Sequence, residues 1–256
     1  MVATLPDFLT VPERSTKPRH NGLTHVIDPG VGLAALDDFL EGCDRLVDVV
    51  KLGWGTSYVD PRVAEKVRRL KARDILVSLG GTLFEVALLD GKLGELRDWA
   101  GEMGVDVVEV SNGTIDLPHE RKVAIIAELS RDFRVLSEVG SKDVDTVIAP
   151  YRWVEAIKRE LGAGAWKIVA EGRESGTAGL YRANTEIRHG LVEEIVAAVD
   201  PSSLLFEAPR THQQAWFIRT FGPEANLGNV HWDDVIPLET LRLGLRNDTM
   251  MHLRRL

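Results

Sequence analysis

Acidic side chains follow several short apolar runs in this chain, at the points where buried strands would end. The run WKIVA is followed by EGRESG (residues 171–176), so Glu171 and Arg173 come directly after a candidate strand. Four other acids end apolar runs in the same way: Asp28, Glu109, Glu138 and Glu207. Converging carboxylates repel each other by roughly 4 kcal/mol per pair at about 4 Å and an effective dielectric constant near 20. Such a site requires cations, and oxygen ligands without a histidine or cysteine cluster favour Mg²⁺ over Zn²⁺.

Each of these acids, taken alone, also has an ordinary structural interpretation. An acidic residue after a strand commonly caps the next helix or accepts hydrogen bonds from loop amides. Five acids in the same position relative to five candidate strands favour a common site over five separate caps.

Eight short runs rich in apolar and β-branched residues alternate with segments of helical length. The runs are HVID (25–28), LVDVVK (46–51), DILVSL (74–79), VDVVEV (105–110), FRVLSEV (133–139), WKIVAE (166–171), SLLFEA (203–208) and NLGNV (226–230). This alternation predicts an α/β fold of parallel βαβ units. Eight units in one chain predict a single (β/α)8 TIM barrel over residues 23–256, with a short N-terminal extension over residues 1–22. Active sites of such barrels lie at the C-terminal ends of the strands, where the acids stand.

Composition narrows the possible partners. The formal net charge of -8 argues against nucleic acid or an anionic membrane surface, because both require a positive field over much of one face. Cys43 is the only cysteine, so no intrachain disulfide is possible, and its apolar surroundings predict a buried core thiol. The sequence shows neither a leader-like start nor a run of about 20 apolar residues. We therefore expect a cytoplasmic protein.

Seven segments resemble the phosphosulfolactate synthase family and, more distantly, its plant heat-stress-associated relatives. The segments are KLGWGTS (51–57), GGTLFE (80–85), EVSNGT (109–114), SEVG (137–140), EGRESG (171–176), FEAP (206–209) and LETLRLGLRNDT (238–249). The resemblance runs in order over about residues 22–249. It implies a (β/α)8 enzyme, a carbon–sulfur lyase that adds sulfite to phosphoenolpyruvate with Mg²⁺. Barrels of this kind often assemble, so we expect a homo-oligomer.

The implied reaction assigns roles to the strand-end residues. Sulfite attacks the methylene carbon of phosphoenolpyruvate and electrons move into the carboxylate, so a Lewis-acid metal lowers the barrier. We expect Glu109, Glu138 and Glu171 to hold or orient Mg²⁺, with Asp28 and Glu207 in support. Because Mg²⁺ keeps several waters, some of these acids are expected to orient the direct ligands rather than bind the ion.

Cations are expected to bind the anionic substrates. The planar guanidinium of Arg173 suits the phosphate or carboxylate of phosphoenolpyruvate. Lys51 is assigned to anion binding or proton delivery, and Lys142 to the attacking anion or proton transfer, with Glu171 as a further catalytic residue. Substrate contacts are expected from Gly80, Gly81, Thr82, Ser111 and Asn229. The glycines among them also suit ordinary turns.

Three segments depart from the family pattern. Where the family typically has Asp-Lys-Gly, Ser-Asp-Gly and Glu-Val-Gly-Lys-Lys, this chain has Asp28-Pro29-Gly30, Ser111-Asn112-Gly113 and Glu138-Val139-Gly140-Ser141-Lys142. Two lysines and one acid are thus replaced. The alternatives are the same barrel with a different nucleophile, or a non-catalytic, stress-related scaffold.

The N-terminal segment KPRHNGLT (17–24) resembles the plant relatives. Lys17, Arg19 and His20 therefore have two interpretations: they lean over the site and replace the missing cations, or they form a solvated basic arm.

Two further patterns have competing interpretations. Gly30-Val31-Gly32 follows a strand and opens a helix, with Asp48 downstream, as in a dinucleotide-binding fingerprint. Asp48 lies inside the second candidate strand rather than at its end, so we expect no NAD(P) site. The pairs Trp216-Phe217 and Trp232-Asp233 suit either a subunit contact or packing of helices on the barrel.

Overall fold

A closed barrel of eight parallel strands forms the centre of the computed structural model, which describes residues 6, 8–141 and 148–254. The strands are β1 (Thr24–Asp28), β2 (Val49–Leu52), β3 (Leu76–Leu79), β4 (Val107–Val110), β5 (Arg134–Val139), β6 (Lys167–Ala170), β7 (Leu204–Glu207) and β8 (Leu227–Val230). Each strand pairs with the next in the sequence, and β8 closes the ring onto β1. The predicted (β/α)8 barrel is confirmed, and each of the eight candidate runs overlaps one strand.

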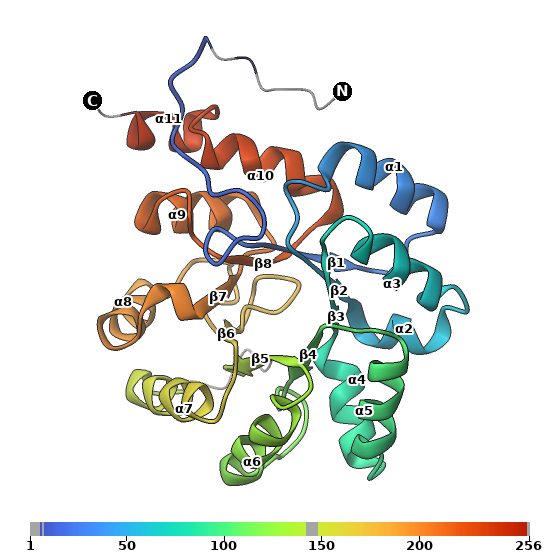
Figure 1. Ribbon diagram of the computed structural model, residues 1–256. Coiled ribbons are helices and arrows are strands. Elements are labelled where there is room, and N and C mark those ends of the chain that lie inside the picture. The colour runs from blue at the N-terminus through green and yellow to red at the C-terminus, as the bar shows by residue number, and fades with distance from the viewer. Residues whose placement is uncertain (1–5, 7, 142–147, 255–256) are drawn as a thin grey trace.

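Helices surround the barrel (Figure 1). The α-helices are α1 (Leu33–Cys43), α2 (Thr56–Val59), α3 (Val63–Lys71), α4 (Gly81–Leu89), α5 (Leu93–Glu102), α6 (His119–Leu129), α7 (Pro150–Gly162), α8 (His189–Ala198), α9 (Thr211–Phe221), α10 (Val235–Arg242) and α11 (Asn247–Leu253). Short 3-10 turns lie at Gly53–Gly55, Pro201–Ser203 and Trp232–Asp234. Cys43, at the end of α1, is buried in the apolar layer between helices and barrel, as predicted.

The strands are buried on both faces, which explains their nearly continuous apolar character. Four side chains form a small apolar cluster inside the barrel: Val107, Leu136, Val169 and Leu205. A second, much larger cluster lies between the strands and the surrounding helices. Because side chains alternate along a strand, residues two positions beyond the inner cluster also point into the barrel.

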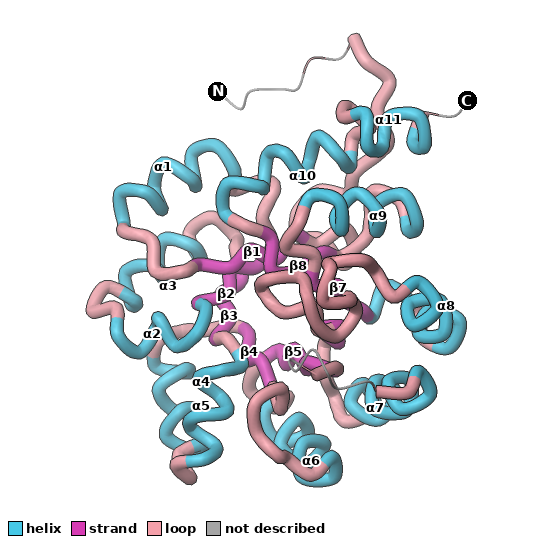
Figure 2. The backbone as a smooth tube through the Cα atoms, turned by 180° about the vertical axis from the view of Figure 1, so that it is seen from behind, coloured by secondary structure: helices cyan, strands magenta, loops and turns pink. Residues whose placement is uncertain are grey.

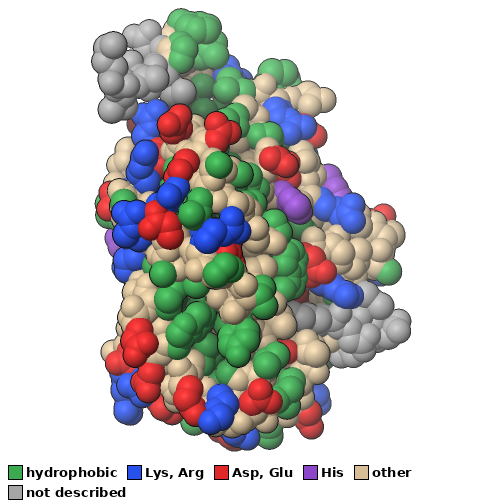
Figure 3. Space-filling view, turned by 90° about the vertical axis from the view of Figure 1, so that its right-hand side faces the viewer, with side chains coloured by type: hydrophobic (Ala, Val, Ile, Leu, Met, Phe, Trp, Pro, Cys, Tyr) green, Lys and Arg blue, Asp and Glu red, His purple; other side chains and the backbone are tan. Residues whose placement is uncertain are grey.

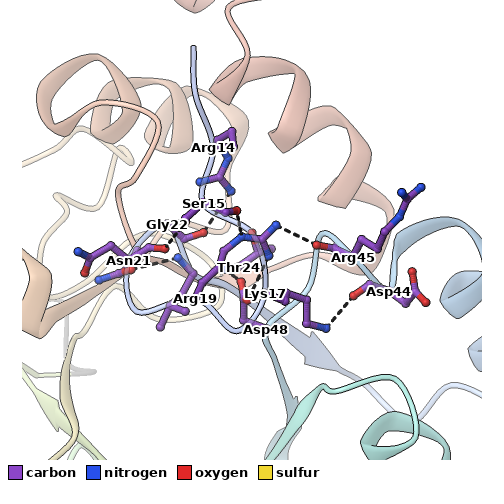
Figure 4. Close-up of polar contacts among 12 residues, drawn as sticks. Arg14, Ser15, Lys17, Arg19, Asn21, Gly22, Thr24, Asp44, Arg45 and Asp48 are labelled. Carbon is purple, nitrogen blue, oxygen red and sulfur yellow. Dashed lines mark hydrogen bonds and ion pairs between the residues drawn. The ribbon is translucent and has the colours of Figure 1, made fainter. Parts of the chain in front are cut away.

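The N-terminal segment lies across the end of the barrel where the strands begin (Figures 1 and 4). Arg19 pairs with Asp48 at 3.1 Å, and Asp48 also accepts the amide of Thr24 at the start of β1. Lys17 donates to the carbonyl oxygens of Asp44 and Arg73, and His20 is exposed. The expectation that these cations lean over the site is therefore wrong, because they stand at the opposite end of the barrel.

The outer surface carries both signs of charge. The face shown in Figure 3 mixes acidic, basic and apolar side chains rather than presenting a continuous basic field. Within the part of the chain that the structure describes, no helix is long and apolar enough to cross a bilayer. The aromatic pairs serve packing within this chain, since Phe217 stacks on Phe206 and Trp232 stacks on Phe39 at 3.7 Å between ring centroids.

Candidate active site

A cavity of about 260 Å³ opens at the end of the barrel where the strands finish. Its lining residues are Ile27, Lys51, Gly53, Trp54, Gly80, Gly81, Thr82, Glu109, Thr114, Glu138, Glu171, Arg173, Glu174, Glu207 and Asn229. Figure 2 views this end of the molecule, where the loops that follow the strands gather. The cavity brings together most of the residues that the sequence singled out.

Four buried glutamates form the floor and walls of the cavity. Glu109, Glu138, Glu171 and Glu207 are each at most 5% exposed. Each lies two residues after a member of the inner apolar cluster, on β4, at the end of β5, just beyond β6 and on β7. Strand alternation thus places all four carboxylates on one level, directly above the apolar filling of the barrel.

Lys51 stands among these carboxylates as their buried counter-ion. Its ammonium lies 3.3 Å from Glu109 and 3.5 Å from Glu207. Burial by itself would lower the pKa of Lys51, but Glu109, Glu207 and the other two glutamates outweigh it and raise this pKa above its ordinary value. Lys51 is therefore a permanent cation at neutral pH.

Glu109 titrates in an unusual range. Burial raises its pKa to about 7, a rise that Lys51 opposes and that Glu138 and Glu207 reinforce. Its other carboxylate oxygen accepts the amide of Gly81, at the N-terminus of α4, at 2.8 Å. The ammonium of Lys51 thus compensates the charge of Glu109 only in part.

The glycine pair before α4 has a close-packing reason. A Cβ on Gly81 would lie 2.6 Å from the Cβ of Ser111, and one on Gly80 would lie 3.0 Å from the carbonyl oxygen of Leu52. These glycines let the start of α4 approach the cavity wall. Thr82 follows them at the cavity edge.

Arg173 lies in the loop that follows β6 and reaches the cavity with a partly exposed side chain. Its backbone is in the left-handed region, with φ of 60°, and its amide donates to the carboxylate of Glu171 at 2.6 Å. Its guanidinium lies 3.8 Å from the carboxylate of Glu174. The guanidinium is therefore placed at the mouth of the cavity, where an anion would enter.

A hydrogen-bond chain links β1, β8, β7 and the loop after β6. The buried His25 accepts the backbone amide of Asn229 through Nδ1, and the side-chain amide of Asn229 donates to Glu207. The second carboxylate oxygen of Glu207 accepts a hydrogen bond from the amide of Gly172 at 2.9 Å. The phenol of Tyr181 donates to the backbone carbonyl oxygen of Glu207. Burial and the charge of Lys51 lower the pKa of His25 well below its ordinary value, so its imidazole is neutral.

Two of the predicted site residues that the structure describes, Asp28 and Ser111, do not line the cavity. Asp28 points outward from the barrel, because Ile27 takes the inward position, and its carboxylate pairs with Lys66 of α3 at 2.9 Å. The hydroxyl of Ser111 donates to Glu85 of α4 at 2.6 Å, behind the cavity wall. Lys142 lies outside the described residues.

Some cavity residues had no strong sequence signal. Trp54 lies in a 3-10 turn, and Thr114 and Glu174 are loop residues. His25, which does not line the cavity but bonds to Asn229 beside it, is a single histidine in an apolar run. Trp54 and Glu174 lie within the family-like segments KLGWGTS and EGRESG, which is the signal that pointed toward them.

The oxygen donors of the cavity suit a divalent cation that takes few protein ligands. No group of three or more His, Cys, Asp or Glu side chains stands ready to bind a metal within residues 8–141 and 148–254. Mg²⁺, however, commonly takes only one or two carboxylates and completes its shell with water and substrate oxygens. Four buried glutamates around one lysine fit that requirement by charge and by ligand chemistry.

The fold and the cavity define a (β/α)8 protein with a site for a small ligand at the C-terminal ends of its strands. A solved structure with the same fold is 3-keto-L-gulonate-6-phosphate decarboxylase from Vibrio cholerae, with a TM-score of 0.57. It is 10% identical, and the match covers 91% of this chain and 99% of that one. This likeness supports the barrel fold alone.

Sequence comparison identifies the family. The family described as (2R)-phospho-3-sulfolactate synthase (ComA) matches residues 12–248. Phosphosulfolactate synthase of Bacillus subtilis is 41% identical over 95% of this chain and 98% of its own length. The synthase of Methanothermobacter thermautotrophicus is 41% identical over 95% and 96%. The chain therefore belongs to the phosphosulfolactate synthase family, a family of enzymes.

A plant protein is a more distant relative. Protein HEAT-STRESS-ASSOCIATED 32 of Arabidopsis thaliana is 22% identical over 90% of this chain and 88% of its own length. The resemblance noted in the sequence thus extends to both groups, with the synthases much more similar.

Proposed function

We propose that this enzyme adds sulfite to the methylene carbon of phosphoenolpyruvate, as a carbon–sulfur lyase that uses Mg²⁺. The observation that carries the proposal is the cavity itself, in which four buried glutamates, Lys51 and Arg173 meet in a chain of the synthase family. The product would carry a phosphate ester on C2 and a sulfonate on C3, in line with the family description.

The bond changes balance without an oxidant or reductant. The sulfur lone pair of sulfite forms the C–S bond at C3 while the C2–C3 π pair shifts toward the carboxylate. C2 then takes up one proton, so bisulfite and phosphoenolpyruvate together supply every atom of the product. No group leaves, and the phosphate remains on its oxygen.

This chain's own residues bind and orient the two anions. Arg173 offers a planar pair of donors to the phosphate or carboxylate at the cavity mouth. Lys51 is a fixed ammonium inside the cavity, where charge develops as the C–S bond forms. Its raised pKa favours anion binding over proton delivery, because a strongly held proton is transferred poorly. Proton delivery then falls to Lys142, which stays a prediction.

Mg²⁺ would be held at Glu138 and Glu171, which come from the neighbouring strands β5 and β6, with Glu109 and Glu207 paired to Lys51. When bound, it would supply a Lewis acid for the substrate carboxylate. Charge also supports this assignment, because the lining acids Glu109, Glu138, Glu171, Glu174 and Glu207 outnumber Lys51 and Arg173. Two anionic substrates would otherwise enter a cavity that is already negative.

Phosphorus NMR tests the proposal. Purified protein with Mg²⁺, phosphoenolpyruvate and sulfite is expected to produce a new phosphate-ester resonance that disappears without metal or without sulfite. Lys51→Met should slow product formation by at least about 100-fold. Lys66→Met is the matched control, because Lys66 is equally buried but pairs with Asp28 and Asp60 outside the cavity.

The outcomes separate the alternatives. Phosphoenolpyruvate that binds but gives no product with sulfite would support a different nucleophile. Protein that binds neither anion would contradict the enzymatic proposal and favour the stress-related scaffold. Equal loss of activity in the Lys51 and Lys66 variants, with both folded, would remove Lys51 from its proposed role. A cytoplasmic location and a homo-oligomeric state stay predictions.

A further inference from the structure

The loop between β6 and α8 (residues 171–188) carries three residues of the cavity wall: Glu171, Arg173 and Glu174. The loop is long and passes over the end of the barrel (Figure 2). At its base, the amide of Gly172 bonds to Glu207 and the amide of Leu180 bonds to the carbonyl of Glu171. Together with the bond from the amide of Arg173 to the carboxylate of Glu171, these contacts fix the base of the loop, and the far side of the turn that bears Arg173 is held by α9.

That turn spans residues 173–176 and is closed by a hydrogen bond from the amide of Gly176 to the carbonyl of Arg173, at 3.0 Å. The carbonyl of Gly176 in turn accepts a hydrogen bond from the side chain of Gln213 at 3.1 Å. Gly176 is thus anchored to α9 through Gln213, and it lies three residues after Arg173 in the same hydrogen-bonded turn.

Gln213 contacts both limbs of the loop with one side-chain amide. Its Nε2 donates to Gly176 on the outgoing limb and to the carbonyl of Thr185, at 3.3 Å, on the returning limb. Its Oε1 accepts the amide of Arg210 at 3.2 Å, which fixes the orientation of the amide. The side chain is 0% exposed, so water does not compete for these bonds.

The fit between Gln213 and Gly176 leaves no spare room. A Cβ on Gly176 would lie 2.5 Å from Nε2 of Gln213, and the φ of Gly176 is 67°, in the region that favours glycine. The last glycine of EGRESG is therefore required by this contact. Other contacts to the loop from this region come from exposed side chains. Arg210, just before α9, donates to the carbonyl of Ser175, and the ring of His212 contacts the hydroxyl and the carbonyl oxygen of Thr185.

We propose that Gln213 is a positioning residue, which clamps the two limbs of the 171–188 loop and thereby holds Arg173 at the cavity mouth. Gln213 does not line the cavity, so it acts through the loop rather than on a substrate. The kinetic consequence rests on the proposed function, in which Arg173 binds phosphoenolpyruvate. The structural consequence does not rest on that function.

Trypsin digestion of the full chain tests the clamp without any catalysis. Arg173 and Arg182 are natural cleavage sites on the loop. Gln213→Leu should raise the rate of cleavage after these arginines at least about tenfold. Mass spectrometry of the fragments measures this rate. Gln214→Leu is the matched control, because Gln214 is 1% exposed on the same helix but bonds to Ala208 instead of the loop. Its loop cleavage should stay at the wild-type rate.

A second variant approaches the same contact from the loop. Gly176→Ala places a methyl group against Nε2 of Gln213 and should likewise raise cleavage, and the double variant should add little to either single change. In steady-state kinetics, Gln213→Leu should raise KM for phosphoenolpyruvate at least about tenfold with a much smaller change in kcat.

Two results would overturn the proposal. One is wild-type cleavage of the loop in both Gln213→Leu and Gly176→Ala. The other is a fall in kcat with KM unchanged in an active Gln213→Leu enzyme. If the wild-type protein made no product, the cleavage arm would still decide whether Gln213 clamps the loop.

Discussion

Single residues set the charge balance of the cavity. Lys51 is held as a cation by the glutamates around it, while the pKa of Glu109 rises to about 7 because burial outweighs that one counter-ion. His25 below them is held neutral by burial and by Lys51. The site therefore combines a fixed ammonium, a carboxyl group with a raised pKa and a neutral imidazole that accepts a hydrogen bond through Nδ1.

The neutral state of His25 predicts a pH dependence of stability. Its folded pKa lies below the ordinary value of 6.5, so its contribution to stability is present above pH 6.5 and is lost as the pH falls. The loss should be about 1.4 kcal/mol per pH unit below 6.5 while the buried imidazole stays neutral. Urea unfolding at pH 5 and pH 7.5 measures it.

Asn is the matched replacement for His25. The side-chain oxygen of Asn can take the place of Nδ1 as acceptor for Asn229, and it does not titrate. His25→Asn should therefore retain the fold and lose less stability than the wild type between pH 7.5 and pH 5. An equal loss in both proteins would show that His25 is not the titrating group.

At the level of elements, the sequence was sufficient to predict the barrel and most of its rim. Eight apolar runs with the right spacing gave eight strands, and four of the five strand-end acids meet in the cavity. Asp28 is the exception. A shift of one residue along a strand exchanges the inward and outward side chains, and in β1 it is Ile27 that faces inward. The hydrogen bonds of neighbouring strands fix that register in a closed barrel, and a single run does not display it.

Sequence patterns could not predict the contacts between residues that lie far apart in the chain. The side chain of Gln213 meets a loop about thirty residues away, and Arg19 meets Asp48 on the opposite end of the barrel from the cavity. Neither contact leaves a periodicity or a spacing in the chain. The sequence consequently left two interpretations of the N-terminal segment open, a cover over the site or a solvated basic arm. The structure supports neither, because the segment is bonded to residues at the beginnings of the strands.

This placement predicts that the N-terminal segment stabilises the barrel without affecting the cavity. Arg19 and Asp48 are both about 6% exposed, so Arg19→Ala leaves a buried carboxylate without its partner. The free energy of unfolding should fall by about 3 kcal/mol, measured in urea. Lys92→Ala breaks the exposed pair with Glu95 and should leave the free energy of unfolding nearly unchanged, because water solvates both charges.

The kinetic parameters complete this test. The folded Arg19→Ala protein should keep the KM and kcat of the wild type, because Arg19 and the cavity lie at opposite ends of the barrel. A raised KM in this variant would instead connect the N-terminal segment to the site.

The charge of the whole molecule bears on how it takes up anionic substrates. The chain carries a formal net charge of -8, and among the described residues the cavity is lined by more acids than bases. Long-range steering would therefore repel phosphoenolpyruvate and sulfite, and the attraction must come from short-range cations in the cavity. In the proposed reaction, Lys51 and Arg173 would supply part of this attraction, and a divalent cation would supply the rest.

This balance predicts that Mg²⁺ and phosphoenolpyruvate bind cooperatively. In calorimetric titrations at constant ionic strength, removing Mg²⁺ with a chelator should weaken phosphoenolpyruvate binding at least about tenfold. By linkage, phosphoenolpyruvate should strengthen Mg²⁺ binding by the same factor. Glu138→Gln should reduce this coupling, whereas Asp28→Asn should leave it intact, because Asp28 faces Lys66 outside the cavity. Equal phosphoenolpyruvate affinity with and without Mg²⁺ would mean that Lys51 and Arg173 alone overcome the negative charge of the cavity.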